Sequence, residues 1–235
     1  MMDLMKLELK GITIRIYILS TLVITLVMLG MLYLFAYAPQ LDPSDADMRL
    51  FAGFNHMIPL FSVLNMTVFC VMSAVMYSRF VIEEYTGQRV ILLFSYPIKR
   101  GKIFISKVMV VSLFTIIAMV LSNLIIFAIF GISEAISPLV GERITFEVIT
   151  KVIKTTAMMA VSAAGLGVIA MGIGFIRKST PTAIISAVLL CSLLCNIVAG
   201  SLTSTVPALV FMAITIIVGI LFTNTVMKKI SYMEV

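Results

Sequence analysis

Six apolar segments, each about as long as a membrane-spanning helix, constrain this chain more than any other feature. They cover approximately residues 16–38, 56–77, 103–131, 155–176, 182–199 and 206–227. A helix needs about 20 mainly apolar residues to cross the hydrocarbon core of a bilayer. Hydrophobic residues make up 61% of the 235 residues and charged residues 12%, which is far from the composition of a soluble domain. The sequence therefore predicts an all-α integral membrane protein with one transmembrane domain over residues 1–235.

The basic residues predict how the six spans are oriented. Thirteen Lys and Arg residues lie in the segments on the side of the two termini, and four lie on the other side. The thirteen are Lys6, Lys10, Arg15, Arg79, Arg89, Lys99, Arg100, Lys102, Lys107, Arg177, Lys178, Lys228 and Lys229; the four are Arg49, Arg143, Lys151 and Lys154. Basic residues beside spans favour the cytoplasmic side. We therefore expect both termini in the cytoplasm and outer loops at residues 39–55 and 133–150.

The residues before the first span have a helical apolar pattern. Met5, Leu9, Ile12 and Ile16 follow a helical spacing, with charged residues between them. This pattern predicts an amphipathic helix on the inner membrane surface, although the segment could also be only the start of the first span. The net charge of +6 requires no nucleic acid, because basic residues beside spans bind anionic lipid head groups.

Asp, Glu, Lys and Arg residues are absent from the middle of every predicted span. Because such residues are kept where protons or ions are relayed, their absence argues against an ion-coupled transporter. Four neutral residues are candidates for a substrate path: Asn65, Ser122, Asn123 and Asn196. The alternative is that these side chains hydrogen-bond neighbouring helices. With one histidine, His56, a multi-histidine metal site is excluded.

The fourth span contains many small residues. Ala160 and Ala164, Ala163 and Gly167, and Ala170 and Gly174 are each four apart, a spacing that lets two helix backbones approach closely. The contact could lie within the chain or between two copies. Cys70, Cys191 and Cys195 all fall in apolar segments, which predicts buried packing residues rather than a metal or disulfide site.

The segment between the second and third spans, residues 83–107, combines charge with a short apolar run. Glu83 and Glu84 suit the start of a helix, Val90 to Phe94 provides an apolar face, and Pro97 ends or redirects the helix. The basic residues from Lys99 to Lys102 would anchor the next span at the anionic inner surface. These features predict a short cytoplasmic helix that docks into a partner's groove; the alternative is a helix lying on lipid.

This segment, read as E-E-Y-x-G-x-x-x-x-L-L-x-S-Y-P-I-K-R-x-K-I-F-x-x-K, and the six spans resemble the permease subunit of an ABC-2 type ABC transporter. By that resemblance the segment would form the coupling helix that contacts an ATPase subunit. The residues that match the family's pattern are Glu83, Glu84, Gly87, Leu92, Leu93, Tyr96, Pro97, Lys99 and Arg100, followed by Lys107 at the entry to the next span.

The resemblance implies a function and a set of partners. Two permease chains would pair in a bacterial cell membrane, and each would rest on a cytoplasmic ATPase that binds ATP and Mg. The chain itself contains no G-x-x-x-x-G-K-[ST] sequence, the motif that cradles nucleotide phosphates, so we expect no cofactor and no enzymatic activity on it. The cargo would be a peptide, antimicrobial, drug or lipid moved outward.

Two other classes of protein remain as alternatives. Glu83-Glu84 with Arg89 weakly resembles the EExxxR motif of intramembrane CAAX-type proteases, but the arginine is one place too far along and further histidines are missing. A membrane sensor or scaffold that transports nothing is the second alternative.

Overall fold

A computed structural model describes residues 14–41, 53–86, 100–136, 145–201 and 205–231. The described residues form helices and no strands. The six long helices are α2 (Ile14–Leu41), α4 (Phe54–Tyr77), α7 (Arg100–Ile136), α8 (Phe146–Arg177), α9 (Thr180–Ser201) and α10 (Thr205–Ser231). They coincide with the six predicted spans. Five are long and apolar enough to cross a membrane, and α9 contains a shorter apolar stretch, Thr180–Leu193.

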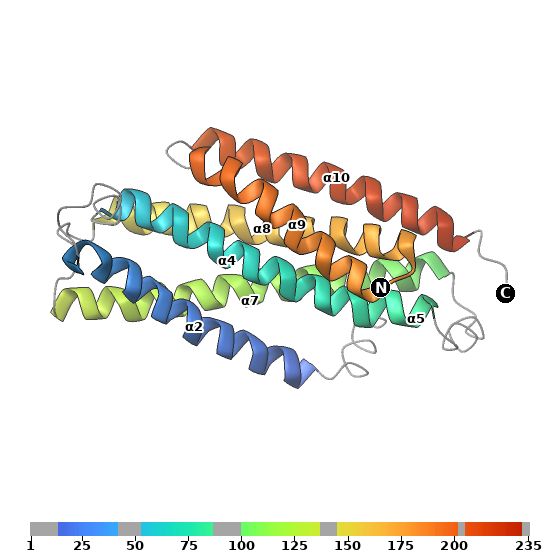
Figure 1. Ribbon diagram of the computed structural model, residues 1–235, viewed down its shortest axis with the longest axis horizontal. Helices are drawn as coiled ribbons and strands as arrows, with labels where there is room; N and C mark the ends of the chain where they lie inside the picture. The colour runs from blue at the N-terminus through green and yellow to red at the C-terminus, as the bar shows by residue number, and fades with distance from the viewer. Residues whose placement is uncertain (1–13, 42–52, 87–99, 137–144, 202–204, 232–235) are drawn as a thin grey trace.

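Successive helices run in opposite directions, so the bundle has two ends (Figure 1). The beginnings of α2, α7 and α9 and the ends of α4, α8 and α10 lie at one end, at the right of the view. The order of apolar spans and short connections in the sequence predicts this alternation, because a chain that has crossed a membrane must cross back to continue in the next span.

Helix α8 is the centre of the bundle, and its small residues explain why. It packs against α4, α7, α9 and α10, and 78% of its most apolar window is buried, against 11% in α2 and 17% in α10. A Cβ atom on Gly167 would lie 3.0 Å from Cβ of Ser73 in α4, and one on Gly174 would lie 2.5 Å from Cβ of Ala183 in α9. The close packing predicted for this span therefore occurs within the chain.

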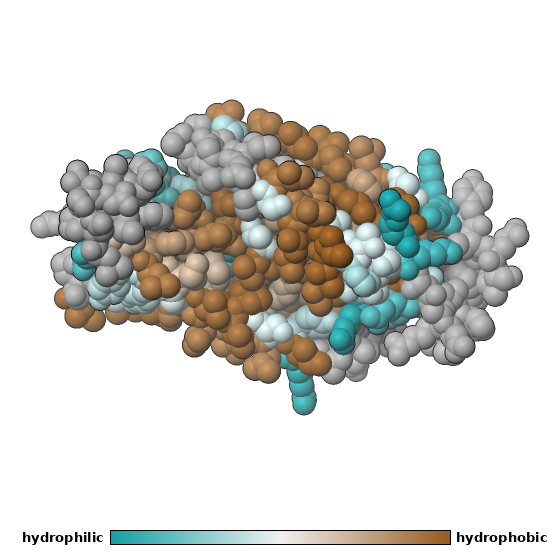
Figure 2. Space-filling view, in the orientation of Figure 1, coloured by the Kyte–Doolittle hydropathy of each residue, from teal (hydrophilic) through white to brown (hydrophobic). Residues whose placement is uncertain are grey.

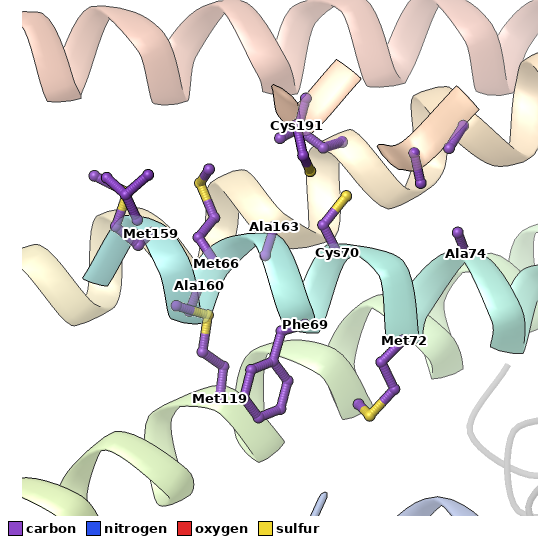
Figure 3. Close-up of a cluster of buried hydrophobic side chains, with 14 of the residues drawn as sticks. Met66, Phe69, Cys70, Met72, Ala74, Met119, Met159, Ala160, Ala163 and Cys191 are labelled. Carbon is purple, nitrogen blue, oxygen red and sulfur yellow. The ribbon is translucent and has the colours of Figure 1, made fainter. Parts of the chain in front are cut away.

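Methionine and small residues fill the middle of the bundle (Figure 3). Met66 and Phe69 of α4 and Met119 of α7 have no exposed surface, and Ala160 and Ala163 of α8 belong to the same cluster. The flexible thioether side chain fills irregular gaps between helices. Cys70 and Cys191 are buried free thiols in this cluster, as the sequence predicts, and Cys195 lies outside the described side chains.

The helices extend further than the predicted spans, and one loop is shorter as a result. Helix α8 begins at Phe146 and α7 continues to Ile136, so the outer loop predicted for residues 133–150 is wrong at both of its ends. Glu134, predicted in that loop, is buried in the last turn of α7. A helix can extend past the hydrocarbon because its backbone hydrogen bonds stay internal in water as in lipid.

The turn between α8 and α9 has a defined local cause. Lys178 ends α8 in the left-handed region with φ 51°, and the backbone N–H of Ser179 donates to the carbonyl of Gly174 at 3.1 Å. Pro181 follows in the first turn of α9, where its missing N–H costs no helical hydrogen bond. The chain therefore reverses its direction in a tight turn between α8 and α9.

Candidate functional site

Helix α4 does not end where the predicted second span ends. The helical backbone continues through a π-helical turn, η2 (Ser78–Ile82), into α5 (Glu83–Thr86). Glu83 and Glu84 stand in the first turn of α5, but α5 continues the helical backbone of α4 and η2 without a break. The two carboxylates therefore do not lie at a free helix N-terminus. Val81 and Ile82, just before them, are buried in the bundle.

Glu84 forms an ion pair with Lys107 of α7. The Lys107 side chain is 4% exposed and the Glu84 side chain 25% exposed. Glu83, by contrast, is exposed. The predicted coupling residues thus differ in what they can contact, since the carboxylate of Glu84 is engaged within the chain and that of Glu83 faces outward.

An aromatic cluster lies beside the ion pair. The ring centroid of Tyr85 is 6.3 Å from that of Phe104 in α7 and 5.9 Å from that of Phe175 in α8. The centroids of the two phenylalanine rings are 6.4 Å apart. All three residues are buried. Edge-on ring contacts at these distances add to the stability given by burial alone. Three helices therefore meet where α5 ends.

The structure does not describe the side chains of the other predicted coupling residues. Arg100 is the first residue of α7, and its side chain lies outside the described residues. The remaining six also lie outside the described residues: Gly87, Leu92, Leu93, Tyr96, Pro97 and Lys99. The structure describes the two ends of the predicted coupling segment and nothing between them.

Three of the four predicted path residues bond side chains of neighbouring helices in the interior of the bundle. Nδ2 of Asn65 in α4 donates to Oδ1 of Asn123 in α7 at 2.5 Å, and Nδ2 of Asn123 donates to the Thr156 hydroxyl in α8 at 3.0 Å. Ser122 lies 2.9 Å from the Thr25 hydroxyl of α2. These contacts match the alternative that the neutral residues join neighbouring helices. Asn196 lies outside the described side chains.

Three further residues make polar contacts between helices and are not singled out by the sequence: Thr25, Thr156 and Tyr77. The buried Tyr77 hydroxyl is 2.7 Å from the Ser112 hydroxyl and donates to the Val108 carbonyl at 3.2 Å. Thr156 lies at the predicted start of its span, where a polar residue is expected and does not indicate a buried contact. A helical-phase comparison with the buried Met159, Ala160 and Ala163 would have placed Thr156 on the inner face of α8.

A half-open cavity of about 860 Å³ lies between α4, α7 and α8 near the end of the bundle opposite the ion pair. Its walls are mainly aliphatic and aromatic, with Asn123 and Thr156 as the polar side chains of the lining. Leu124 and Ile153 of the lining are exposed on the surface of the bundle. One of the four predicted path residues, Asn123, therefore lines this half-open cavity.

Most basic side chains of the described residues lie at the end of the bundle that contains the ion pair. Arg15, Arg79, Lys102, Lys107, Arg177, Lys178, Lys228 and Lys229 lie there, whereas Lys151 and Lys154 lie in the first turns of α8, at the other end. Figure 2 shows an apolar band across the middle of the visible face and hydrophilic residues towards the right end. Within the described ranges, no three His, Cys, Asp or Glu side chains lie close enough to hold a metal ion.

Comparisons with known proteins agree with this architecture. Residues 4–193 match the model of a family described as ABC-2 family transporter protein. The chain is also similar to the uncharacterized protein YcbO of Bacillus subtilis (strain 168), with 28% identity over 205 residues, which are 87% of this chain and 88% of that protein. No solved structure matches the chain significantly.

Proposed function

Because the chain belongs to the ABC-2 family of transporter proteins, we propose that it is the permease subunit of an ATP-driven exporter. Two such chains form the membrane part, as a homodimer or a heterodimer, and each rests on a separate ATPase subunit that binds ATP and Mg. The cargo is a peptide, an antimicrobial, a drug or a lipid, and it leaves the cell.

The observation that carries this proposal is the gathering of basic side chains at one end of the bundle. Lys and Arg beside spans favour the cytoplasmic side. The segment 87–99 joins α5 to α7 at that same end, so a cytoplasmic ATPase reaches it. In this orientation both termini lie in the cytoplasm, and an amphipathic helix before α2 lies on the inner membrane surface of the bacterial cell membrane.

The coupling residues and the substrate path are part of the same proposal. The segment that carries Gly87, Leu92, Leu93, Tyr96, Pro97 and Lys99 docks on the ATPase, with Glu83 at its start and Arg100 at its end. The substrate path follows Asn65, Ser122, Asn123 and Asn196, which belong to helices that must shift for cargo to pass. Asn123 supports this role because it lines the cavity.

Labelling with a thiol reagent that cannot cross membranes tests the orientation. Lys102 and Phe146 are exposed and lie at opposite ends. In a chain whose three cysteines are replaced by alanine, Phe146→Cys should react in intact cells and Lys102→Cys only after the cells are opened. Labelling of Lys102→Cys from outside would put the 87–99 segment out of reach of any ATPase and end the proposal.

Gentle detergent extraction tests the partner. A tagged chain should recover an ABC-type ATPase, and ATP hydrolysis by the recovered complex should depend on the permease. The matched variant is Pro97→Ala, which should insert into the membrane normally and lose permease-dependent hydrolysis. Recovery of the folded chain without any ATPase contradicts the permease function.

A further inference from the structure

The two helix ends that flank residues 87–99 are held together by contacts within the chain. Glu84 and Tyr85 stand just before this segment, and Phe104 and Lys107 stand just after it on successive turns of α7. Glu84 pairs with Lys107, and Tyr85 packs on Phe104. An ionic contact and an aromatic contact therefore connect the two helix ends that flank residues 87–99.

The burial of Lys107 makes the ion pair more than a surface contact. Exposed ion pairs contribute little, because water screens the charges and the side chains lose freedom. Lys107, however, is 4% exposed, and a charge that is removed from water needs a partner. Loss of the Glu84 carboxylate would therefore remove an ionic partner from a buried ammonium group.

The π-helical turn sets the direction of these side chains. Such turns are short and recur at functional sites. The turn Ser78–Ile82 changes the rotation of every residue that follows it. After it, Glu83 faces outward, Glu84 turns towards Lys107, and Tyr85 is buried between Phe104 and Phe175.

We propose that the Glu84–Lys107 pair and the ring cluster of Tyr85, Phe104 and Phe175 form a clamp that makes the inner ends of α5 and α7 move as one body. Glu84 and Lys107 are positioning residues in this arrangement. Force applied to residues 87–99 then moves α4 and α7 together rather than parting them. This inference rests on the proposed function, and it gives Glu84 a partner inside the chain in place of the ATPase expected from the family pattern.

Distance measurements between two spin labels test the clamp in the full complex of permease and ATPase. Arg79 and Lys102 are exposed and stand on the two sides of the clamp, on η2 and α7. With the native cysteines replaced by alanine, labels at Arg79→Cys and Lys102→Cys should give one narrow distance that stays unchanged when ATP and vanadate are added. A distance that changes with nucleotide in the otherwise native chain overturns the clamp.

Variants of the pair separate clamping from simple stability. Glu84→Gln and, independently, Lys107→Met should broaden and lengthen the label distance, and permease-dependent ATP hydrolysis should be lost while the ATPase still co-purifies. The exchange of both charges, Glu84→Lys with Lys107→Glu, should restore the narrow distance. Arg15→Gln, an exposed charge at the same end, should change nothing.

The outcomes distinguish the clamp from the function on which it rests. An unchanged distance and unchanged hydrolysis in both Glu84→Gln and Lys107→Met overturn the clamp and leave the permease function standing. If the charge exchange restores the narrow distance but not hydrolysis, Glu84 acts through the ATPase instead, and the clamp is wrong. If no ATPase co-purifies while the labels still report the narrow distance, the permease function fails and the contact itself remains.

Discussion

Helices α4 and α2 are similarly apolar, yet 67% of the most apolar stretch is buried in the helix that contains α4 and 11% in α2. Both helices contact α7. Polar contacts of three residues, Asn65, Tyr77 and Glu84, connect α4 and its extension to α7. Helix α2 meets α7 through hydroxyl groups, at Thr25 and Tyr33.

The difference teaches that apolarity places a helix in the membrane without deciding whether it faces lipid or protein. Lipid tails are as apolar as a leucine side chain, so small residues and hydrogen bonds choose the partners. Gly167 of α8 allows the close approach of α4, and the exposed leucine and valine side chains of α2 remain available to lipid. Comparable substitutions at the contacts of α4 and at those of α2 should therefore lower the stability of the protein by different amounts.

The largest effect is expected where α8 accepts α4. Gly167→Leu should destabilise the protein by more than about 3 kcal/mol, the upper end of overpacking costs, because even a Cβ atom would lie 3.0 Å from Cβ of Ser73. Thermal unfolding in detergent, followed by size-exclusion chromatography, measures the loss of folded monomer. Gly30→Leu in α2 is the control, since nothing lies within 4 Å of a Cβ there. Equal losses would mean that α2 is packed as tightly as α4.

The next effect is expected at the charged end of the α4 extension. Glu84→Ala should cost about 2–3 kcal/mol, because it removes an ionic partner of a buried ammonium group. Lys107→Met, which keeps the volume of the side chain, should cost less, about 1 kcal/mol, since the Glu84 left behind is 25% exposed and retains water. Denaturant titration of both variants gives the order. A larger loss from Lys107→Met would contradict the burial difference on which the clamp is argued.

The sequence predicts the number, order and approximate limits of the helices, because length and apolarity are local properties. It also predicts the close packing of α8 and the interhelical alternative for Asn65 and Asn123, since small and amide residues in a span have few other uses. The partner of Glu84 could not be predicted. A π-helical turn precedes Glu84, and no local sequence pattern indicates that turn or places Glu84 opposite Lys107. From the sequence, Glu83 and Glu84 therefore indicate only the start of a short helix between two spans.

A smaller effect is expected from the amide contacts in the middle of the bundle. Interhelical hydrogen bonds in membranes are worth about 0.6 kcal/mol on average. Asn123 makes two and Asn65 donates one of them, so Asn123→Leu should cost roughly twice as much as Asn65→Leu. A double-mutant cycle with Thr156→Val checks the assignment. Additive losses in the cycle would show that Asn123 and Thr156 do not interact.

The smallest effect is expected at the contact of α2 with α7. The Thr25 hydroxyl lies 2.7 Å from the Thr21 carbonyl of its own helix and 2.9 Å from the Ser122 hydroxyl. Its single proton is shared between these two acceptors, so the bond to Ser122 is weak. Thr25→Val removes both contacts but makes α2 more apolar, so the net change should be about 0.5 kcal/mol or less. The unfolding measurement used for Asn123→Leu reports it. A loss as large as that of Asn123→Leu would mean that α2 is held by hydrogen bonding as strongly as α4, because a helix held mainly by lipid contact should tolerate this exchange.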